Sequence, residues 1–265
     1  MPHRASTEAV GQIGRPAGCN DRLWRPSREG CNRVLVRRRH RLRGSFTEPM
    51  AKHPKTPVVS DAQVQALLRR HACPTPFHAV RTHLLGSIAS PDMQVSPMKA
   101  VAALWGGELP VFDSDAAANE LIGALVMGAW NQLSRHQERS APFRLTRIGV
   151  PVTREGLATL ARTRCEEIDG FIAGLFGDQE SLDLPERAHH ALKVLKEMRA
   201  MLEGTREVAE NPSKPAEPAN IAIVLGQLRE LTRIAEHEMH ELVLSCARAR
   251  RQMLRAMPAA RPVLH

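Results

Sequence analysis

Two histidines and three glutamates lie together in the segment Glu236-His237-Glu238-Met239-His240-Glu241, whose residue types are typical of metal ligands. Imidazole and carboxylate groups at helical spacing can share one transition-metal ion. The spacing is His-x-x-His, so the His-Glu-x-x-His pattern of zinc proteases is absent. A rotation of about 100° per residue from an apolar stripe centred on Leu228 places His237 and His240 on the solvent side of the expected helix. We therefore expect a solvated face without a cofactor, and a metal site at His237 and His240 is the alternative.

Cysteine thiols are the strongest potential nucleophiles in this sequence. Cys165 is followed by Glu166 and Glu167, and nearby negative charges raise the pKa of a thiol, which opposes nucleophilic catalysis. Cys246 falls among apolar residues of its expected helix and is predicted to be a small core residue. The five cysteines include no Cys-x-x-Cys pair and follow no apolar leader, so we expect free thiols in a reducing cytoplasm. These side chains predict a protein that is not an enzyme and has no catalytic residues.

Four arginines lie near the end of the last expected helix: Arg248, Arg250, Arg251 and Arg255. Cations in the final turn of a helix interact favourably with the helix dipole, which is a purely structural explanation. The same cluster is suited to bind an acidic protein surface or a nucleic-acid backbone. We expect these four arginines to be the candidate partner-binding residues.

The net charge of +9 is concentrated at the two ends of the chain. Residues 1–49 hold 11 arginines and four acidic residues, residues 242–265 hold five arginines and no acid, and the 192 residues between them carry a charge of −3. Attraction to phosphates would therefore reside in the ends. Aromatic residues make up 3% of the chain, so base stacking is poorly supported. No run of 18 apolar residues predicts a membrane span.

Residues 1–56 form a basic N-terminal extension without helical periodicity. Arginine, glycine, proline and serine dominate it, and such a segment cannot bury enough apolar surface to offset its chain entropy, so we expect disorder. The composition changes sharply at Met50, and in one interpretation translation starts there. A basic arm for nucleic acid, an organellar transit peptide and an inert tail are the other interpretations.

From residue 57 onward the sequence predicts an all-α protein. Apolar residues recur at spacings of three and four in each segment, which is the pattern of amphipathic helices. The segment at residues 145–152 is the one weak candidate for a strand. Side chains that can cap a helix N-terminus precede the expected helices: Ser60 in a capping box, Thr75, Ser96, Ser114 or Asp113, and Thr153.

The last third of the chain predicts a helical hairpin. Pro185 begins one helix, three prolines within residues 211–218 end it, and a final helix runs from Ala219 to about Met257, some 38 residues. The first helix of the hairpin is shorter than the final helix by about a third. The far end of the final helix therefore needs another apolar surface, from the rest of the chain or from a second chain. The expected organisation is the extension, a helical domain at residues 57–180 and the hairpin at residues 181–265.

Residues 104–108 read Leu-Trp-Gly-Gly-Glu and precede a helix that ends in Trp-Asn, which resembles the YecA/YgfB family of bacterial proteins. Residues 169–174, Asp-Gly-Phe-Ile-Ala-Gly, resemble a second helix of that family, which typically reads Gly-Phe-Leu-x-Gly. The similarity spans residues 75–178. It is carried by Trp105, Gly106, Gly107, Trp130, Asn131, Gly170, Phe171 and Gly174.

The resemblance implies an all-helical and often dimeric bundle without established catalytic residues, some of whose members are thought to act by binding regulatory proteins. No cysteine follows Cys246, so the zinc motif that some YecA-like members append is not expected. We thus expect a non-catalytic cytoplasmic bundle that acts as a protein–protein interaction or regulatory module. Its partner is an unidentified protein or a second copy. A nucleic-acid-associated regulator that uses the Arg-rich ends, and a metal-dependent enzyme, are the alternatives.

Overall fold

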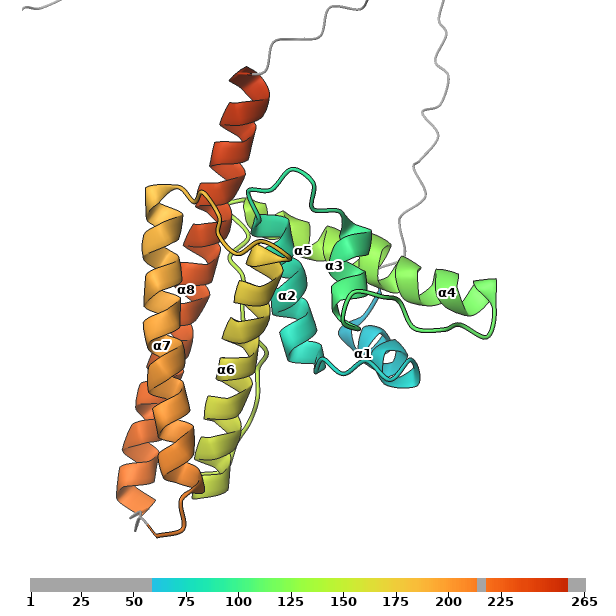
Figure 1. Cartoon of the computed structure of the whole chain (residues 1–265). Helices are drawn as coiled ribbons and strands as arrows, with labels where there is room; N and C mark the ends of the chain where they lie inside the picture. Colours follow the sequence, from blue (N-terminus) through green and yellow to red (C-terminus); the bar gives the residue numbers. More distant parts are fainter. Residues whose placement is uncertain (1–58, 214–217, 257–265) are drawn as a thin grey trace, which may run out of the picture. The chain divides into compact units, whose positions relative to one another are not determined.

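The computed structural model describes residues 59–213 and 218–256, which belong to a compact unit spanning residues 53–265. The predicted N-terminal extension and the proposed start at Met50 lie outside the described residues. Within the described residues the chain is helical and contains no strand, so the all-α prediction is confirmed and residues 145–152 are not a strand. In chain order the elements are α1 (Asp61–Arg70), α2 (Phe77–Ala89), α3 (Pro97–Ala103), α4 (Asp115–Ile122), η1 (Gly123–Trp130), α5 (Asn131–Ser134), η2 (Arg135–Gln137), α6 (Arg154–Phe176), α7 (Glu186–Glu210) and α8 (Pro218–Ala256) (Figure 1).

Side-chain caps begin four of these helices where the sequence predicts them. Ser60 forms the capping box of α1, because its Oγ accepts from the Gln63 N–H and the Gln63 side chain accepts from the Ser60 N–H at 2.9 Å. Thr75 was predicted wrongly, since Pro76 is the N-cap of α2 and Thr75 Oγ1 donates to the Leu104 carbonyl at 3.2 Å. Three further predicted caps are confirmed: Ser96, Ser114 and Thr153.

Helices α2 and α6 approach each other closely because glycines face the opposing backbone. A Cβ atom on Gly174 would lie 1.9 Å from the carbonyl oxygen of His83, and one on Gly86 would lie 2.1 Å from that of Phe171. Real side chains never make such contacts with a backbone, so this crossing requires glycine at both positions. The phenylalanine is itself fully buried, and the glycines therefore let the two helices share one core.

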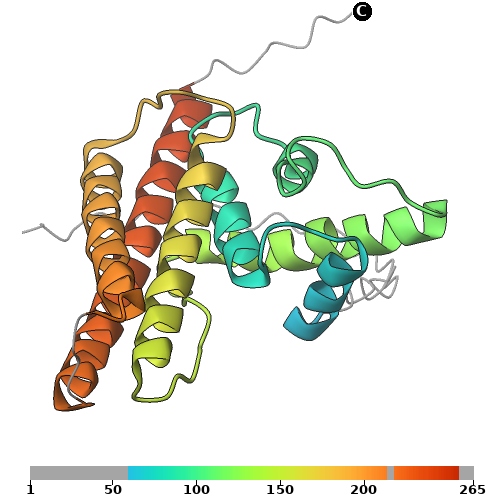
Figure 2. The same cartoon turned by 60° about the horizontal axis from the view of Figure 1, so that its bottom comes forward.

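Three long helices, α6, α7 and α8, pack side by side, and α7 and α8 form the predicted hairpin (Figures 1 and 2). α8 has 39 residues and α7 has 25, which agrees with the predicted difference in length. α8 also packs against α2 and η2, which its shorter partner α7 leaves room for. The chain itself therefore supplies the additional surface that the sequence requires, although Met253 near the end of α8 remains 45% exposed.

A connecting segment at residues 138–153 joins η2 to α6, begins with a turn, and is held by two buried carboxylates instead of by a neighbouring strand. Glu236 of α8 accepts the backbone N–H of Leu145 at 3.0 Å, and Glu167 of α6 accepts that of Thr146 at 2.8 Å. Arg164 forms a buried ion pair with Glu167 and donates to the Thr146 carbonyl at 2.9 Å. These bonds satisfy backbone groups that a sheet would otherwise pair, so the segment stays extended without becoming a strand.

Candidate functional site

The two candidate metal ligands lie in different environments on α8. His237 is exposed, as predicted, but His240 is only 7% exposed, so the prediction that it faces solvent was wrong. α8 contacts η2, which contains His136, in addition to the helices that cover its apolar stripe, and this second contact buries His240. Burial and the charge of His136 lower the pKa of His240. Nowhere in the described ranges do three or more potential metal ligands come together, so these two histidines have no third ligand there.

The four predicted partner-binding arginines divide into two groups. Arg250 donates to the carbonyl of Ile88 at 2.6 Å and to Gln137 Oε1 at 3.1 Å, so it joins α8 to the end of α2 and to η2. Arg251 donates to the Gln137 carbonyl at 3.1 Å but is exposed. Arg248 and Arg255 are also exposed. Arg250 is thus mainly structural, and the other three remain accessible to a ligand.

The residues that carry the family resemblance have turn and packing roles in this chain. Trp105 Nε1 donates to the His71 carbonyl at 3.0 Å and so ties the end of α3 to the end of α1. Gly106 and Gly107 have φ values of 85° and 110°, in the left-handed region that favours glycine, and end α3 as predicted. The remaining residues of the set lie within η1, α5 and α6: Trp130, Asn131, Gly170, Phe171 and Gly174.

The buried cysteines are poorly suited to nucleophilic chemistry. Burial raises the pKa of both Cys165 and Cys246 to about 11, so the thiols stay protonated at neutral pH. Cys246 is fully buried, which confirms its predicted core position. After burial, the largest cause of the raised pKa of Cys165 is the charge of Glu203. The two neighbours in sequence pair elsewhere, Glu166 with a histidine and Glu167 with an arginine. The sequence predicted the direction of this shift but named the wrong neighbours.

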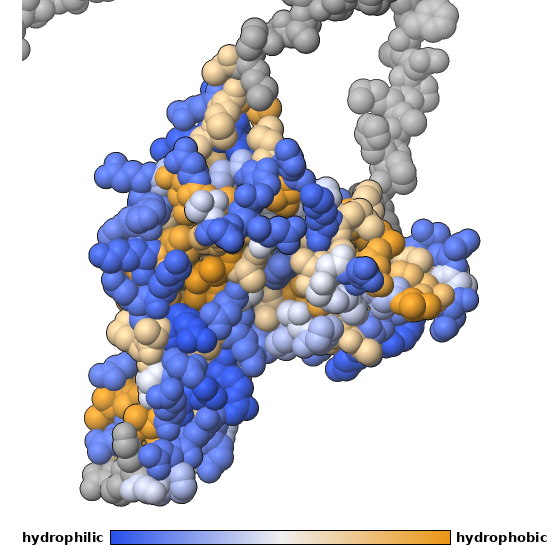
Figure 3. Space-filling view, in the orientation of Figure 1, coloured by the Kyte–Doolittle hydropathy of each residue, from blue (hydrophilic) through white to orange (hydrophobic). Residues whose placement is uncertain are grey.

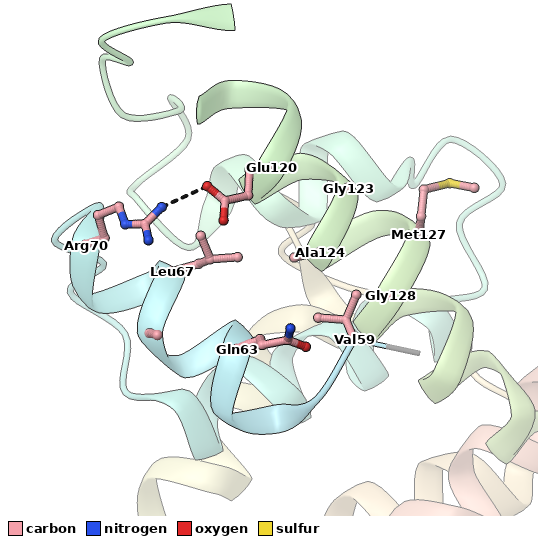
Figure 4. Close-up of a pocket in the computed structure, with 10 residues that line it drawn as sticks. Val59, Gln63, Leu67, Arg70, Glu120, Gly123, Ala124, Met127 and Gly128 are labelled. Atoms are coloured by element: carbon pink, nitrogen blue, oxygen red, sulfur yellow. Dashed lines mark hydrogen bonds and ion pairs between the residues drawn. The ribbon is translucent and has the colours of Figure 1, made fainter. Parts of the chain in front are cut away.

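A groove of about 630 Å³ lies between α1 and the continuous helical stretch formed by α4 and η1 (Figure 4). Its floor is apolar, and the Leu67 side chain points from α1 toward Ala124 of η1. The sequence did not predict this groove, because each helix by itself has an ordinary amphipathic pattern. The lining residues are Val59, Gln63, Ala66, Leu67, Arg70, Glu120, Gly123, Ala124, Met127 and Gly128.

One wall of the groove is a π-helix, η1, which extends over eight residues. π-Helical turns are rare and occur frequently at functional sites. Two of the η1 residues that line the groove are glycines. A Cβ atom on Gly123 would meet no atom within 4 Å, whereas one on Gly128 would lie 2.8 Å from the Val59 side chain. The groove is therefore open at Gly123 and covered at Gly128. These two glycines are the one feature of the sequence that could have indicated it.

The rim of the groove is exposed and mostly polar. Arg70 NH1 lies 2.8 Å from Glu120 Oε2, so an ion pair crosses the groove at one end (Figure 4). Both side chains are more than half exposed, and Met127 at the other end is 56% exposed. Elsewhere on the face in Figure 3, apolar patches interrupt a largely hydrophilic surface. An apolar floor with a polar rim is the usual composition of binding grooves.

Comparisons of the chain with family models, with curated proteins and with solved structures give no match. No helix among the described residues is long and apolar enough to cross a membrane.

Proposed function

We propose that this chain is a non-catalytic interaction protein, and that it binds an apolar helical segment of a partner protein in the groove between α1 and η1. The observation that supports the proposal is the groove of about 630 Å³ between α1 and η1, most of whose lining residues are apolar. Insertion of an amphipathic helix into such a groove is a recurring mode of peptide recognition. The proposal agrees with the role implied by the resemblance to YecA/YgfB proteins, and we extend that role to a regulatory module of the cytoplasm.

The dimensions of the groove favour a helix as the occupant. α1 has ten residues and is about 15 Å long at 1.5 Å per residue, so two to three turns of a partner helix would lie along it. Apolar side chains of the partner at positions i, i+3 or i+4, and i+7 would then contact Ala66 of α1 and Met127 of η1, the exposed apolar residues of the lining, above the buried Leu67 and Ala124. The missing Cβ at Gly123 leaves room for one of these side chains to approach the backbone of η1.

The rim would select the orientation of the partner. Arg70 and Glu120 pair with each other at 2.8 Å while more than half exposed, and such surface ion pairs contribute little to stability, at most about 1 kcal/mol. Their separation to contact polar groups beside the apolar face of a partner helix therefore costs little. Met127 adds an exposed, flexible apolar side chain, which is typical of surfaces that adapt to a bound helix.

Site-specific photo-crosslinking in the native cells tests the proposal. A photoreactive amino acid in place of Met127 is expected to capture one protein, whose cross-linked peptide is helical and amphipathic when identified by mass spectrometry. The same amino acid in place of Glu197, a side chain that is 61% exposed on α7, is the background control. Gly123→Leu is expected to abolish the cross-link, because its side chain fills the groove where no atom lies within 4 Å.

The matched control for Gly123→Leu is Gly204→Leu, which introduces the same side chain at another helical glycine with open space around it, on α7. This variant should keep the cross-link. Equal capture at positions 127 and 197, or a cross-link that survives Gly123→Leu, would contradict the proposal. A cross-link between two copies of the chain would replace it by a homodimer interface.

A further inference from the structure

A second cleft, of about 440 Å³, lies between the last turns of α8 and the residues that follow η2. Arg248, Arg251 and Arg255 reach it from one face of α8, because they are three and four residues apart. Arg139 reaches it from the other side. Glu138 is the one acidic residue among the lining residues, which are Gln137, Glu138, Arg139, Leu244, Arg248, Arg251, Gln252 and Arg255.

The four guanidinium groups of this basic cleft have no carboxylate partner among the described residues. Like charges three or four residues apart on a helix repel, so the cluster destabilises the end of α8 unless an anion neutralises it. Arginines elsewhere in the described chain are commonly ion-paired, and eight of them pair with a carboxylate: Arg70, Arg144, Arg162, Arg164, Arg187, Arg199, Arg206 and Arg233.

The helix dipole does not explain the cluster. Its effect falls off within the last turn of a helix, and only Arg255 lies in the last described turn of α8. Arg248 lies about two turns before Ala256, beyond that range. Arg139 is in the turn that follows η2, so it does not belong to α8 at all. The four positive charges converge from two elements that are distant in sequence.

The walls of the basic cleft are held in place by hydrogen bonds at its base. Arg250 donates to Ile88 and Gln137, and Arg251 donates to the Gln137 carbonyl. The C-terminal turns of α8 are therefore fixed to η2, so the backbone that carries three of the arginines is in place before any ligand arrives. Arginines on a fixed backbone lose less entropy on binding than arginines on a flexible segment.

We propose that the basic cleft binds a compact anion that carries two or more phosphate groups. Guanidinium groups form paired, charge-assisted hydrogen bonds with phosphate oxygens. Four arginines and one glutamate give the cleft a formal charge of +3, which a short chain of phosphates matches within one small volume. A carboxylate-bearing peptide spreads the same charge over several residues. None of the described residues that line the cleft is aromatic and available for stacking, so we assign the cleft to a compact ligand and not to a nucleic-acid strand.

Isothermal titration of the full chain with tripolyphosphate at about 0.15 M salt tests this assignment. We expect saturable binding at one site per chain, and at least ~10-fold weaker binding by the double variant Arg248→Gln/Arg255→Gln, because each lost guanidinium removes charge-assisted bonds. The control is Arg147→Gln/Arg229→Gln, which removes two exposed arginines outside the cleft and changes the net charge equally. The parent chain and both double variants have the same arginines in residues 1–49, so binding of tripolyphosphate there does not affect the comparison.

Three outcomes would overturn the assignment. The first is an equal loss of affinity in the control variant, which would show that only net charge matters. The second is equal affinity for citrate, which would remove the preference for phosphate. The third is tight binding of a 20-nucleotide strand that tripolyphosphate does not displace, which would make the cleft part of a nucleic-acid interface. None of these outcomes depends on the groove between α1 and η1.

Discussion

His240 is buried although its imidazole can be protonated. Neither of its ring nitrogens has a hydrogen-bond partner in the described part of the chain. Burial lowers the pKa of His240, and the pKa values of His83 and His136 are lowered for the same main reason. The folded state therefore favours neutral histidines, because a charged imidazole loses its hydration in the interior.

These shifts predict that the protein loses stability in mild acid. Below the ordinary histidine pKa of about 6.5 the unfolded chain binds more protons than the folded chain, so the free energy of unfolding falls as the pH falls toward the lowered pKa values. Above about pH 6.5 both states hold neutral histidines and this contribution is constant. Urea midpoints measured at pH 7.5 and pH 5.5 are expected to show the difference.

A pair of variants separates this effect from the titration of carboxylates. His240→Leu should reduce the difference between the two midpoints, because it removes a buried group that resists protonation. His237→Leu changes an exposed histidine on the same helix and should leave the difference unchanged. An unchanged pH dependence in His240→Leu would show that its pKa does not affect stability.

At the scale of elements, helical glycines in this chain have opposite roles. Gly174 faces the carbonyl of His83, where a Cβ atom would lie 1.9 Å away, so Gly174→Ala must push α2 and α6 apart. We expect this variant to lose about 1–3 kcal/mol of unfolding free energy. Gly123 has helical dihedral angles and open space around its Cα, so Gly123→Ala should gain about 0.4–1 kcal/mol.

Equilibrium urea unfolding of the two alanine variants and the parent chain measures both changes. Because the two expected changes in unfolding free energy have opposite signs, a general effect of replacing glycine by alanine cannot explain both. If Gly174→Ala were as stable as the parent, the close approach of α2 to α6 would be wrong. If Gly123→Ala were destabilised, the space around Gly123 would be filled by a part of the chain outside the described residues.

Many of the elements could be predicted from the sequence, because local signals dictate them. Ser60, Ser96, Ser114 and Thr153 cap helices that begin one residue later, as their side chains indicated. The π-helical conformation of η1 was not predictable, since its residues also fit an ordinary α-helix. The path of the connecting segment at residues 138–153 was not predictable either, because the buried carboxylates that hold it belong to α6 and α8 and are distant in sequence.

The candidate sites were less predictable than the helices. Sequence reasoning identified Arg248, Arg251 and Arg255, since charge clusters are visible in the sequence, but not Arg139, which joins them only in the folded chain. The groove between α1 and η1 depends on the separation of two helices and left no signal except glycine. Surfaces built from distant segments require the tertiary structure, whereas caps and amphipathic faces do not.

At the scale of the whole molecule, the predicted boundary at residue 180 falls between helices that pack tightly together. α6 contacts α7 and α8, and ion pairs join Arg199 to Asp169 and Arg162 to Glu210 across this contact. Cys165 is buried on the same helix and its thiol points to the carbonyl of Arg199. A fragment that ends at residue 180 would expose this face of α6 to water.

We therefore expect a fragment of residues 50–180 to lack a stable fold. Its amide proton–nitrogen NMR spectrum should show narrow dispersion, whereas the full chain should give well-dispersed peaks from its packed helices. A control fragment that ends at residue 256 keeps all described helices and should resemble the full chain. A well-dispersed spectrum from residues 50–180 would instead establish the independent helical domain that the sequence predicted.

The glycine contacts between α2 and α6 also limit how this sequence can diverge. Gly86, Gly170 and Gly174 each face a carbonyl oxygen across the contact, and a Cβ on any of them would lie within 2.7 Å of that oxygen. Distant relatives that keep this helix crossing must therefore keep glycine at these three places, even when little else is shared. The spacing of these glycines gives a criterion for detecting remote homologues that does not depend on overall sequence identity.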